Sequence, residues 1–271
     1  MSPDERTAAV FRQQEGRSPG DVWLHDLARG TETRFTSLNT VGFGPLWAPD
    51  GSRVAFTAKL GDVFDLYWKD LRGSGEEVIL KTPRDKYLSD WSPDGKLLLY
   101  SEIDPKTKSD LWYVPVDAGS RTSVAFARSD FNESSGRFSP DGRWVAYVSD
   151  ESGRWEAYVR PFPSGAGKWR ISTDGGAQPQ WSRDGKELFY LSGATLSKTV
   201  RSVALRTNGA AFEASAPKPL FEAHVNDWYP LYNSLFYAPT ADRQRFFVSY
   251  VEGSVDSVLN VLTNWTPGQS R

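Results

Sequence analysis

Short apolar runs separated by turn residues recur along the whole chain. The stretch Trp91–Tyr100 shows the unit, in which Ser-Pro-Asp-Gly stands between an aromatic residue and the apolar run Leu97–Tyr100. Ser suits the first position of a type I turn, Pro presets φ at the second, and Gly at the fourth takes a positive φ. Such a turn joins two antiparallel strands, and the unbroken apolar run predicts a strand buried on both faces. A further strand is predicted at Asp110–Val114.

The same turn recurs at a regular spacing. The turn aspartates are about 45 residues apart, except for a longer last gap, and they are Asp4, Asp50, Asp94, Asp141, Asp184 and Asp242. A period in the forties with four short strands per copy is typical of propeller blades, whereas accidental similarity within an antiparallel sandwich would not produce evenly spaced copies. We expect Gly95, Gly142 and Gly185 to have positive φ and the turn aspartates to bond their own backbone.

The fold predicted from this repeat is all-β: a propeller of six blades, each of four antiparallel strands, with incomplete terminal blades. The first blade is expected to lack its first strand and the sixth its last strand, which suggests a segment of a longer chain. Residues 206–219 are expected to be an insertion. The whole chain is predicted to be one domain, with blades at about 1–37, 38–81, 82–127, 128–172, 173–222 and 223–271.

Composition limits the classes of function. The net charge is −2, from 32 basic and 34 acidic residues that are well mixed, so no basic stripe indicates a nucleic-acid partner. There is no cysteine, which excludes disulfides and thiolate metal sites. No apolar run approaches the length of a membrane span, so we expect no membrane insertion by this segment. The 11 Trp, 11 Tyr and 15 Phe residues are enough to fill the space between stacked blades.

The loops opposite the uniform turns are the expected binding face. Within a blade, the connection to the next blade and the loop between the second and third strands lie on one face, and variable loops on a rigid scaffold commonly bind ligands. The alternative is that their aromatic rings plug the channel and their polar groups cap strands. The predicted binding residues are Tyr87, Asp90, Phe131, Asn132, Glu133, Gln178, Asn226, Asp227, Trp228 and Tyr229.

Other chemistry has weaker support in the sequence. A turn Asp that repeats in every copy suits a turn better than a catalytic acid. No cofactor or metal site is predicted, although a channel cation such as calcium held by Asp90, Glu133 or Asp227 stays an alternative. The chain has two histidines and no Gly-x-Ser-x-Gly elbow of a serine hydrolase. A carboxylate pair of the glycosidase type is left open by the many acidic residues.

The Trp-Ser-Pro-Asp-Gly-Lys turn followed by Asp-Leu-Trp resembles the repeats of TolB-type propellers, which are similar to WD repeats in architecture. The stretches Ser152–Pro163, Trp169–Gly176 and Trp181–Tyr190, with the ending Leu259–Trp265, resemble the propeller attached to bacterial Ser/Thr protein kinases. That resemblance implies a sensory or protein-binding region outside a kinase domain, with an extracytoplasmic location in a bacterium. The kinase motifs themselves are absent from the chain.

These observations together predict a non-enzymatic binding or sensor module for a protein, a peptide or a small polar ligand. The enzyme alternative is a propeller lyase or glycosidase acting at the channel mouth. A third alternative is a purely structural or oligomerisation role.

Overall fold

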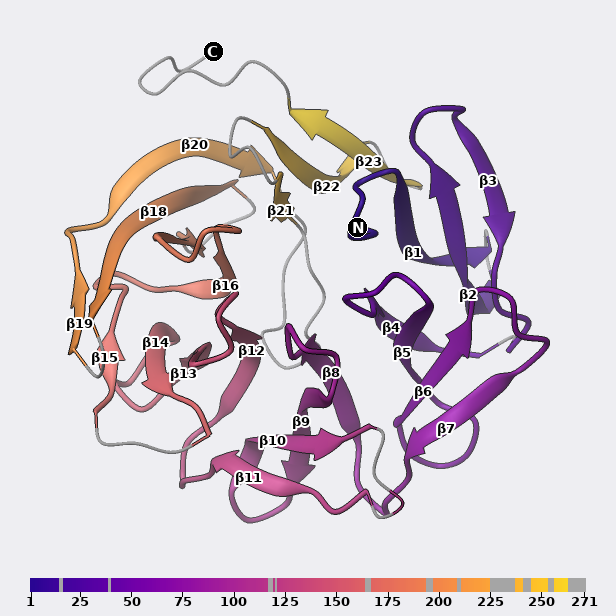
Figure 1. The fold of residues 1–271 in the computed structure, drawn as a ribbon, viewed down its shortest axis with the longest axis horizontal. Coiled ribbons are helices and arrows are strands. Elements are labelled where there is room, and N and C mark those ends of the chain that lie inside the picture. The colour runs from indigo at the N-terminus through magenta and orange to yellow at the C-terminus, as the bar shows by residue number, and fades with distance from the viewer. Residues whose placement is uncertain are drawn as a thin grey trace. The chain divides into compact units, whose positions relative to one another are not determined.

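The computed structural model describes residues 1–14, 17–38, 40–116, 119, 121–163, 167–193, 197–208, 211–224, 237–240, 245–252 and 256–262. They form antiparallel sheets of three to five strands (Figure 1). By its internal contacts the chain divides into two compact units, and their described residues fall in Met1–Asp130 and in Phe131–Arg271 respectively. Among the described residues, no helix is long and apolar enough to cross a membrane.

The first unit contains three sheets in chain order. The first sheet has three described strands and the next two have four each. The strands are β1 (Thr7–Gln14), β2 (Arg17–Asp26) and β3 (Thr31–Arg34); β4 (Gly42–Trp47), β5 (Arg53–Ala58), β6 (Asp65–Asp70) and β7 (Glu76–Leu80); and β8 (Lys86–Trp91), β9 (Leu97–Asp104), β10 (Lys108–Pro115) and β11 (Val124–Ala127).

The second unit also contains three sheets, with four, five and three described strands. The strands are β12 (Glu133–Phe138), β13 (Trp144–Ser149), β14 (Glu156–Pro161) and β15 (Trp169–Arg170); β16 (Ala177–Trp181), β17 (Glu187–Ser192), β18 (Ser197–Asn208), β19 (Ala211–Ala214) and β20 (Lys218–His224); and β21 (Tyr237–Pro239), β22 (Phe246–Glu252) and β23 (Asp256–Leu262).

The all-β, antiparallel prediction is confirmed, whereas the uniform count of four strands per copy is not. The stretch expected to be an insertion, 206–219, contributes strands to the fifth sheet. Its first residues extend β18, whose far end pairs with β19, while β20 pairs with the near end of β18. A hairpin that continues an existing strand keeps its backbone groups hydrogen-bonded, so the extra residues do not form a loop.

The predicted turns are confirmed in detail. Gly95, Gly142 and Gly185 have φ of 73°, 69° and 68°. At Asp94 the carboxylate accepts hydrogen bonds from the Ser92 hydroxyl at 2.7 Å and from the backbone N–H of Lys96 at 3.1 Å. The bonds around Asp141 and Asp184 are the same. In the first turn, Glu5 occupies the position of the glycine with φ of 59°.

Apolar clusters lie between consecutive sheets of each unit. One cluster joins the second and third sheets, with Leu66 and Leu98 fully buried and the rings of Trp68 and Trp91 stacked at 6.3 Å. In the second unit, a cluster around Trp144 and Tyr190 joins the fourth and fifth sheets. The aromatic residues therefore fill the space between sheets, as their number predicts.

The first strand of four sheets carries a bulge at an equivalent place. The register shifts fall between Phe43 and Leu46, Leu88 and Asp90, Ser134 and Arg137, and Ala177 and Gln180. Gly44, Ser135 and Gln178 have positive φ within these bulges. Since a bulge re-aims the side chains beside it, it affects residues that the sequence placed in loops.

Candidate functional site

The predicted binding residues lie partly in strands rather than in loops. Tyr87 and Asp90 belong to β8, Glu133 to β12 and Gln178 to β16, while Phe131 and Asn132 precede β12. Each of these strands begins earlier than the turn residues suggest, because the bulge interrupts the alternation that marks a strand. Four of the predicted residues lie outside the described part of the chain: Asn226, Asp227, Trp228 and Tyr229.

In the first unit, Tyr87 belongs to an aromatic cluster at the loop end of the second and third sheets. The ring centroids of Phe43 and Phe64 lie 5.3 Å apart, and that of Tyr87 lies 6.1 Å from Phe43 and 5.5 Å from Phe64. The Lys59 ammonium lies 5.6 Å from the Phe64 ring centroid. Tyr87 is buried, whereas Phe43 and Phe64 are half-buried and Lys59 is exposed. We call Phe43, Phe64 and Tyr87 the loop-end aromatic cluster.

The cluster is held by hydrogen bonds between two loops. The N–H of Phe64 donates to the Asp85 carboxylate at 2.8 Å, and the N–H of Lys86 donates to the Phe64 carbonyl at 2.9 Å. The Lys86 side chain is fully buried and its Nζ lies 2.9 Å from Oδ1 of Asp65, which is also buried. Lys86 also donates to the Thr82 hydroxyl at 2.9 Å. A buried ammonium with these partners fixes the loop rather than reacting with a substrate.

Carboxylates gather beside this loop at the end of the β9–β10 hairpin. Nη1 of Arg84 lies 3.1 Å from Glu102 and 2.9 Å from Asp104, and Arg128 lies 3.5 Å from both Asp104 and Asp110. Burial raises the pKa of Asp110, against the Thr107 hydroxyl bond and the Arg128 charge. Because Asp110 is only 1% exposed, it is closed to a substrate in this arrangement. No metal-binding group of three such side chains occurs among the described residues.

Asp110 is one of a set of buried acids that the sequence analysis missed. Asp65, Asp110 and Glu156 stand in the third strands of their sheets, β6, β10 and β14, and Asp21 stands in β2 of the three-stranded first sheet; all four are buried. In the first sheet the Thr36 hydroxyl donates to Asp21 at 2.8 Å, and in the fourth the Ser172 hydroxyl donates to Glu156. The Asp-Leu-Trp type of pattern in the sequence contains the acid of two of these strands, Asp65 and Asp110, but it was used only to predict the strands.

The predicted residues of the second unit have structural partners. Asn132 donates to Asp150 through its backbone N–H at 2.9 Å and its side-chain amide at 2.7 Å. Gln178 is buried, and its backbone carbonyl accepts a hydrogen bond from the Tyr237 hydroxyl at 2.9 Å. Glu133 is buried too, whereas Phe131 is 42% exposed. Their binding role stays a prediction.

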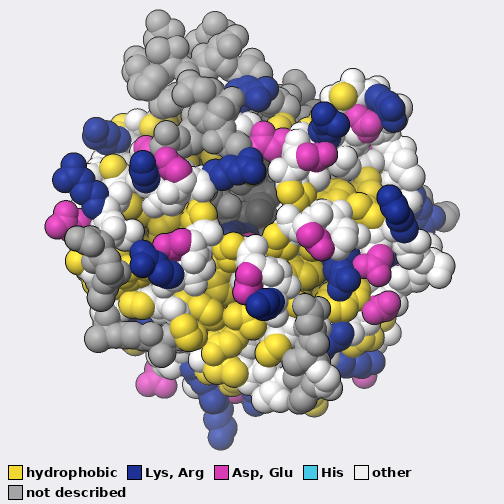
Figure 2. All heavy atoms as spheres, in the orientation of Figure 1, with side chains coloured by type: hydrophobic (Ala, Val, Ile, Leu, Met, Phe, Trp, Pro, Cys, Tyr) yellow, Lys and Arg dark blue, Asp and Glu magenta, His cyan; other side chains and the backbone are white. Residues whose placement is uncertain are grey.

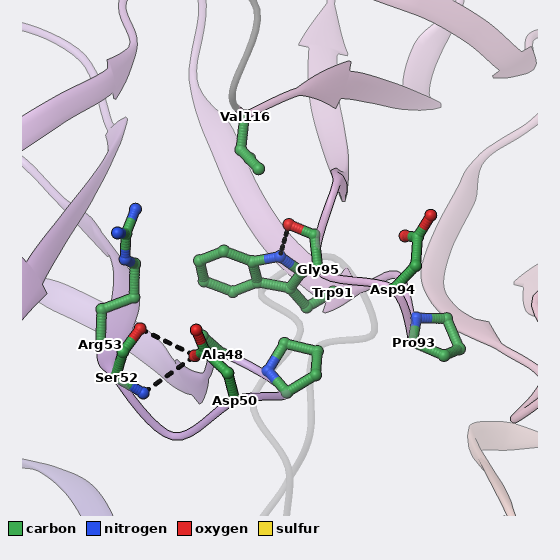
Figure 3. Close-up of a pocket in the computed structure, with 10 residues that line it drawn as sticks. Ala48, Asp50, Ser52, Arg53, Trp91, Pro93, Asp94, Gly95 and Val116 are labelled. Carbon is green, nitrogen blue, oxygen red and sulfur yellow. Dashed lines mark hydrogen bonds between the residues drawn. The ribbon is translucent and has the colours of Figure 1, made fainter.

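A cavity of about 390 Å³ lies at the opposite, turn end of the second and third sheets. It is lined by residues of the two turns that follow β4 and β8, around the ring of Trp91 (Figure 3). This place was not predicted, because the uniform turns favoured a binding face at the loops opposite them.

Charges of both signs are interspersed on the face drawn in Figure 2. Apolar side chains are visible between them over much of that face. The mixture agrees with the well-mixed charges of the sequence.

Comparison with known proteins begins with the family models, none of which matches the chain. Solved structures give the fold. TolB from Acinetobacter baumannii superposes with a TM-score of 0.71 at 18% identity, over 95% of this chain and 61% of that one. The fold is of the TolB type. A stretch of 83 residues is 34% identical to the Tol-Pal system protein TolB of Anaeromyxobacter dehalogenans, covering 30% of this chain and 18% of that protein.

Enzymes share the same fold. The uncharacterized peptidase YuxL of Bacillus subtilis is 26% identical over 189 residues, which are 55% of this chain and 28% of that protein. An oligogalacturonate lyase in complex with manganese superposes with a TM-score of 0.64 at 15% identity, over 97% of this chain and 75% of that one. A puromycin-hydrolyzing peptidase of Mycobacterium tuberculosis superposes with a TM-score of 0.61 at 13% identity, over 97% of this chain and 44% of that one. The chain thus spans less than half of both peptidases.

These findings correct the functional prediction. A non-enzymatic binding or sensor module was expected, but a relative named as a peptidase, with neighbours of the same fold that include a lyase and peptidases, supports the enzyme alternative better than that prediction. The prediction rested on the absence of kinase motifs and of a nucleophile elbow, and neither absence excludes another kind of active site. The expected link to a kinase has no support in these comparisons.

Proposed function

We propose that the chain is part of an enzyme that cleaves peptide bonds. The observation that carries the proposal is the alignment of 189 residues with a protein named as a peptidase, at 26% identity. Since the aligned part is 28% of that protein, the activity of the whole peptidase comes to this chain only as a proposal. A finer proposal on the fold is that the sheets are six blades of one propeller.

The loop-end aromatic cluster is the place where this chain would meet a peptide substrate. Phe43 and Phe64 are half-buried rings, and Lys59 adds an exposed cation over Phe64. Rings of this kind contribute contact area at a low entropic cost, and a nearby ammonium can pair with a carboxylate of the substrate. The cluster stands on hydrogen-bonded loops, so its geometry is set before a ligand arrives.

The test is a search for cleaved peptides. The protein, produced both as these 271 residues and as the complete product of its gene, is incubated with a defined peptide mixture, and new termini are identified by mass spectrometry. We expect cleavage by the complete product, with Phe64→Ala raising KM by about tenfold while kcat is unchanged. Leu71→Ala is the matched control, because Leu71 is a 40% exposed apolar residue after β6, at the other end of the sheet. Absence of cleavage by both forms would refute the proposal.

A lyase is the second candidate, favoured by the superposition that covers 75% of the oligogalacturonate lyase chain. Likeness at 15% identity shows the fold alone. Incubation with oligogalacturonate, with and without manganese, followed by ultraviolet absorbance of unsaturated products, tests it. A protein that forms such products and leaves peptides intact is a lyase.

A further inference from the structure

The cavity at the turn end of the first unit has a partly apolar lining. Trp91 stands between Val116 and Asp50 in Figure 3, and Pro49 and Pro93 also line the cavity. The indole N–H of Trp91 donates to the Gly95 carbonyl at 2.9 Å, so the polar atom of the ring is already satisfied. The ring is 6% exposed and stacks on Trp68, so the small part of it that faces the cavity is apolar.

At the cavity, the turn of Gly95 differs in packing from the turns of Gly51 and Gly185. At Gly51 and Gly185 an added Cβ would lie 3.7 Å from Pro3 and 3.6 Å from Pro140, the prolines of the preceding turns. At Gly95 nothing lies within 4 Å of that point. The preceding turn proline, Pro49, therefore does not close over Gly95, and it lines the cavity instead.

The charge that faces this space is negative. Asp50 and Asp94 both line the cavity, and in Figure 3 Asp50 lies below Trp91 and Asp94 to its right. Oδ1 of Asp50 accepts from the N–H and hydroxyl of Ser52, and Oδ1 of Asp94 accepts from Ser92 and Lys96. The hydrogen bonds from Ser52 are the main cause that lowers the pKa of Asp50, and the hydrogen bond from the Ser92 hydroxyl is the main cause that lowers the pKa of Asp94. Both carboxyls are therefore ionised near neutral pH.

The cation in the lining is already neutralised within the protein. Nε of Arg53 lies 3.1 Å from Asp70, and its guanidinium carbon stacks 4.6 Å from the Trp68 ring centroid. The charge of Arg53 also helps to lower the pKa of Asp50, so this one cation is shared between Asp70 and Asp50 and does not balance all the carboxylates around the cavity. An anionic ligand would meet Asp50 and Asp94, whereas a cationic one would be attracted by them.

We propose that this cavity binds the guanidinium or alkylammonium group of a small organic cation or of a basic peptide side chain. The methylene stem of such a group packs on Trp91 and the two prolines, while its charged end pairs with a turn carboxylate. The site is independent of the peptide-cleaving function and lies at the other end of the sheets from the loop-end aromatic cluster.

The experiment is calorimetric titration of the protein with N-acetyl-arginine amide. N-acetyl-citrulline amide, which has nearly the same shape without the charge, is the neutral probe. We expect saturable binding of the arginine probe and at least about tenfold weaker binding of the citrulline probe. A pentapeptide with one central Arg distinguishes the two sources of the cation, since tighter binding of the pentapeptide indicates a peptide ligand.

The chain offers a matched pair of variants. The double substitution Asp50→Asn with Asp94→Asn keeps a side-chain carbonyl for the turn bonds and removes both charges. The control is Asp141→Asn with Asp184→Asn, which alters two turns of the second unit that make the same bonds. We expect the first double variant to bind the arginine probe about tenfold more weakly. The control double variant should bind it as tightly as the unaltered protein.

Three outcomes would overturn the proposal: no saturable binding, equal binding of the citrulline probe, or equal weakening in both double variants. If the first double variant does not fold, Val116→Phe fills the same cavity without changing its charges, and it is expected to weaken binding of the arginine probe. Unchanged binding in that variant places the cation elsewhere.

Discussion

Replacement of Gly95 by Ala isolates the cost of the turn conformation from any steric effect. Gly95 has φ of 73°, and nothing lies within 4 Å of the place where a Cβ would stand. The left-handed region costs an L-residue about 1–2 kcal/mol, while the loss of unfolded-state entropy returns about 0.4–1 kcal/mol. We therefore expect Gly95→Ala to lower the free energy of unfolding by about 1 kcal/mol. Gly95→Val should cost more, because a β-branched residue is more strained there.

Two other positions supply controls of opposite sign. Gly75 also has open space around its Cβ position but lacks a positive φ, so Gly75→Ala should stabilise by about 0.5 kcal/mol. Glu5 adopts φ of 59° in the same turn of the first sheet, so Glu5→Gly should stabilise by about 0.5–1 kcal/mol.

Equilibrium urea unfolding followed by tryptophan fluorescence measures all four variants, with the shift in midpoint taken at constant slope. If Gly95→Ala is no more destabilising than Gly75→Ala, the turn conformation does not carry the cost assigned to it.

Three further perturbations test other parts of the structure. Lys86→Met leaves the buried Asp65 without its cation and should lower the free energy of unfolding by about 3–5 kcal/mol in the same urea assay; the added change Asp65→Leu should recover most of that loss. Burial raises the pKa of Asp110, so the folded state binds the Asp110 proton more tightly than the unfolded state does. The protonated Asp110 therefore contributes fully to stability below about pH 4, and this contribution is lost as the pH rises through the pKa of Asp110 in the folded state. Asp110→Asn should flatten that part of the stability curve, and an unchanged curve would contradict the assignment. The hydrogen bond from Ser92 lowers the pKa of Asp94, which gives the opposite slope: its contribution is present above about pH 4 and is lost as the pH falls, so Asp94→Asn should reduce the loss of stability on acidification.

The turns could be predicted from the sequence because they are local. Ser92, Pro93, Asp94 and Gly95 specify φ, the hydroxyl bond and the carboxylate bond among themselves, so no distant contact is needed to define them. Strand identity followed from the apolar runs for the same reason. The number of strands in the fifth sheet could not be predicted. The β18–β19 hairpin extends β18, and β20 then pairs with the part of the β18 edge that β19 leaves open.

The site could be predicted only in part. Tyr87 was chosen from its loop-like neighbourhood, but its contacts with Phe43 and Phe64 come from residues 44 and 23 positions away and appear only when the two sheets pack. The cavity at Trp91 had no signal in the sequence, since it arises where a proline fails to reach a glycine of the next turn. Both features depend on distances between repeats rather than on the composition of one repeat.

In a repeat protein the positions that recur are poor evidence for a specific function, and the departures from the repeat are better evidence. The buried acids Asp21, Asp65 and Glu156 satisfy the same structural need in three sheets, so none of them is a catalytic candidate on its identity alone. The third sheet departs twice: Asp110 lies beside two further carboxylates, and Gly95 lacks the neighbouring proline that Gly51 and Gly185 have. A departure that costs packing or charge balance at one sheet, while its neighbours avoid that cost, requires a compensating gain. Binding of a cation at the open turn is a gain of that kind, and it can be measured separately from the stability of the fold.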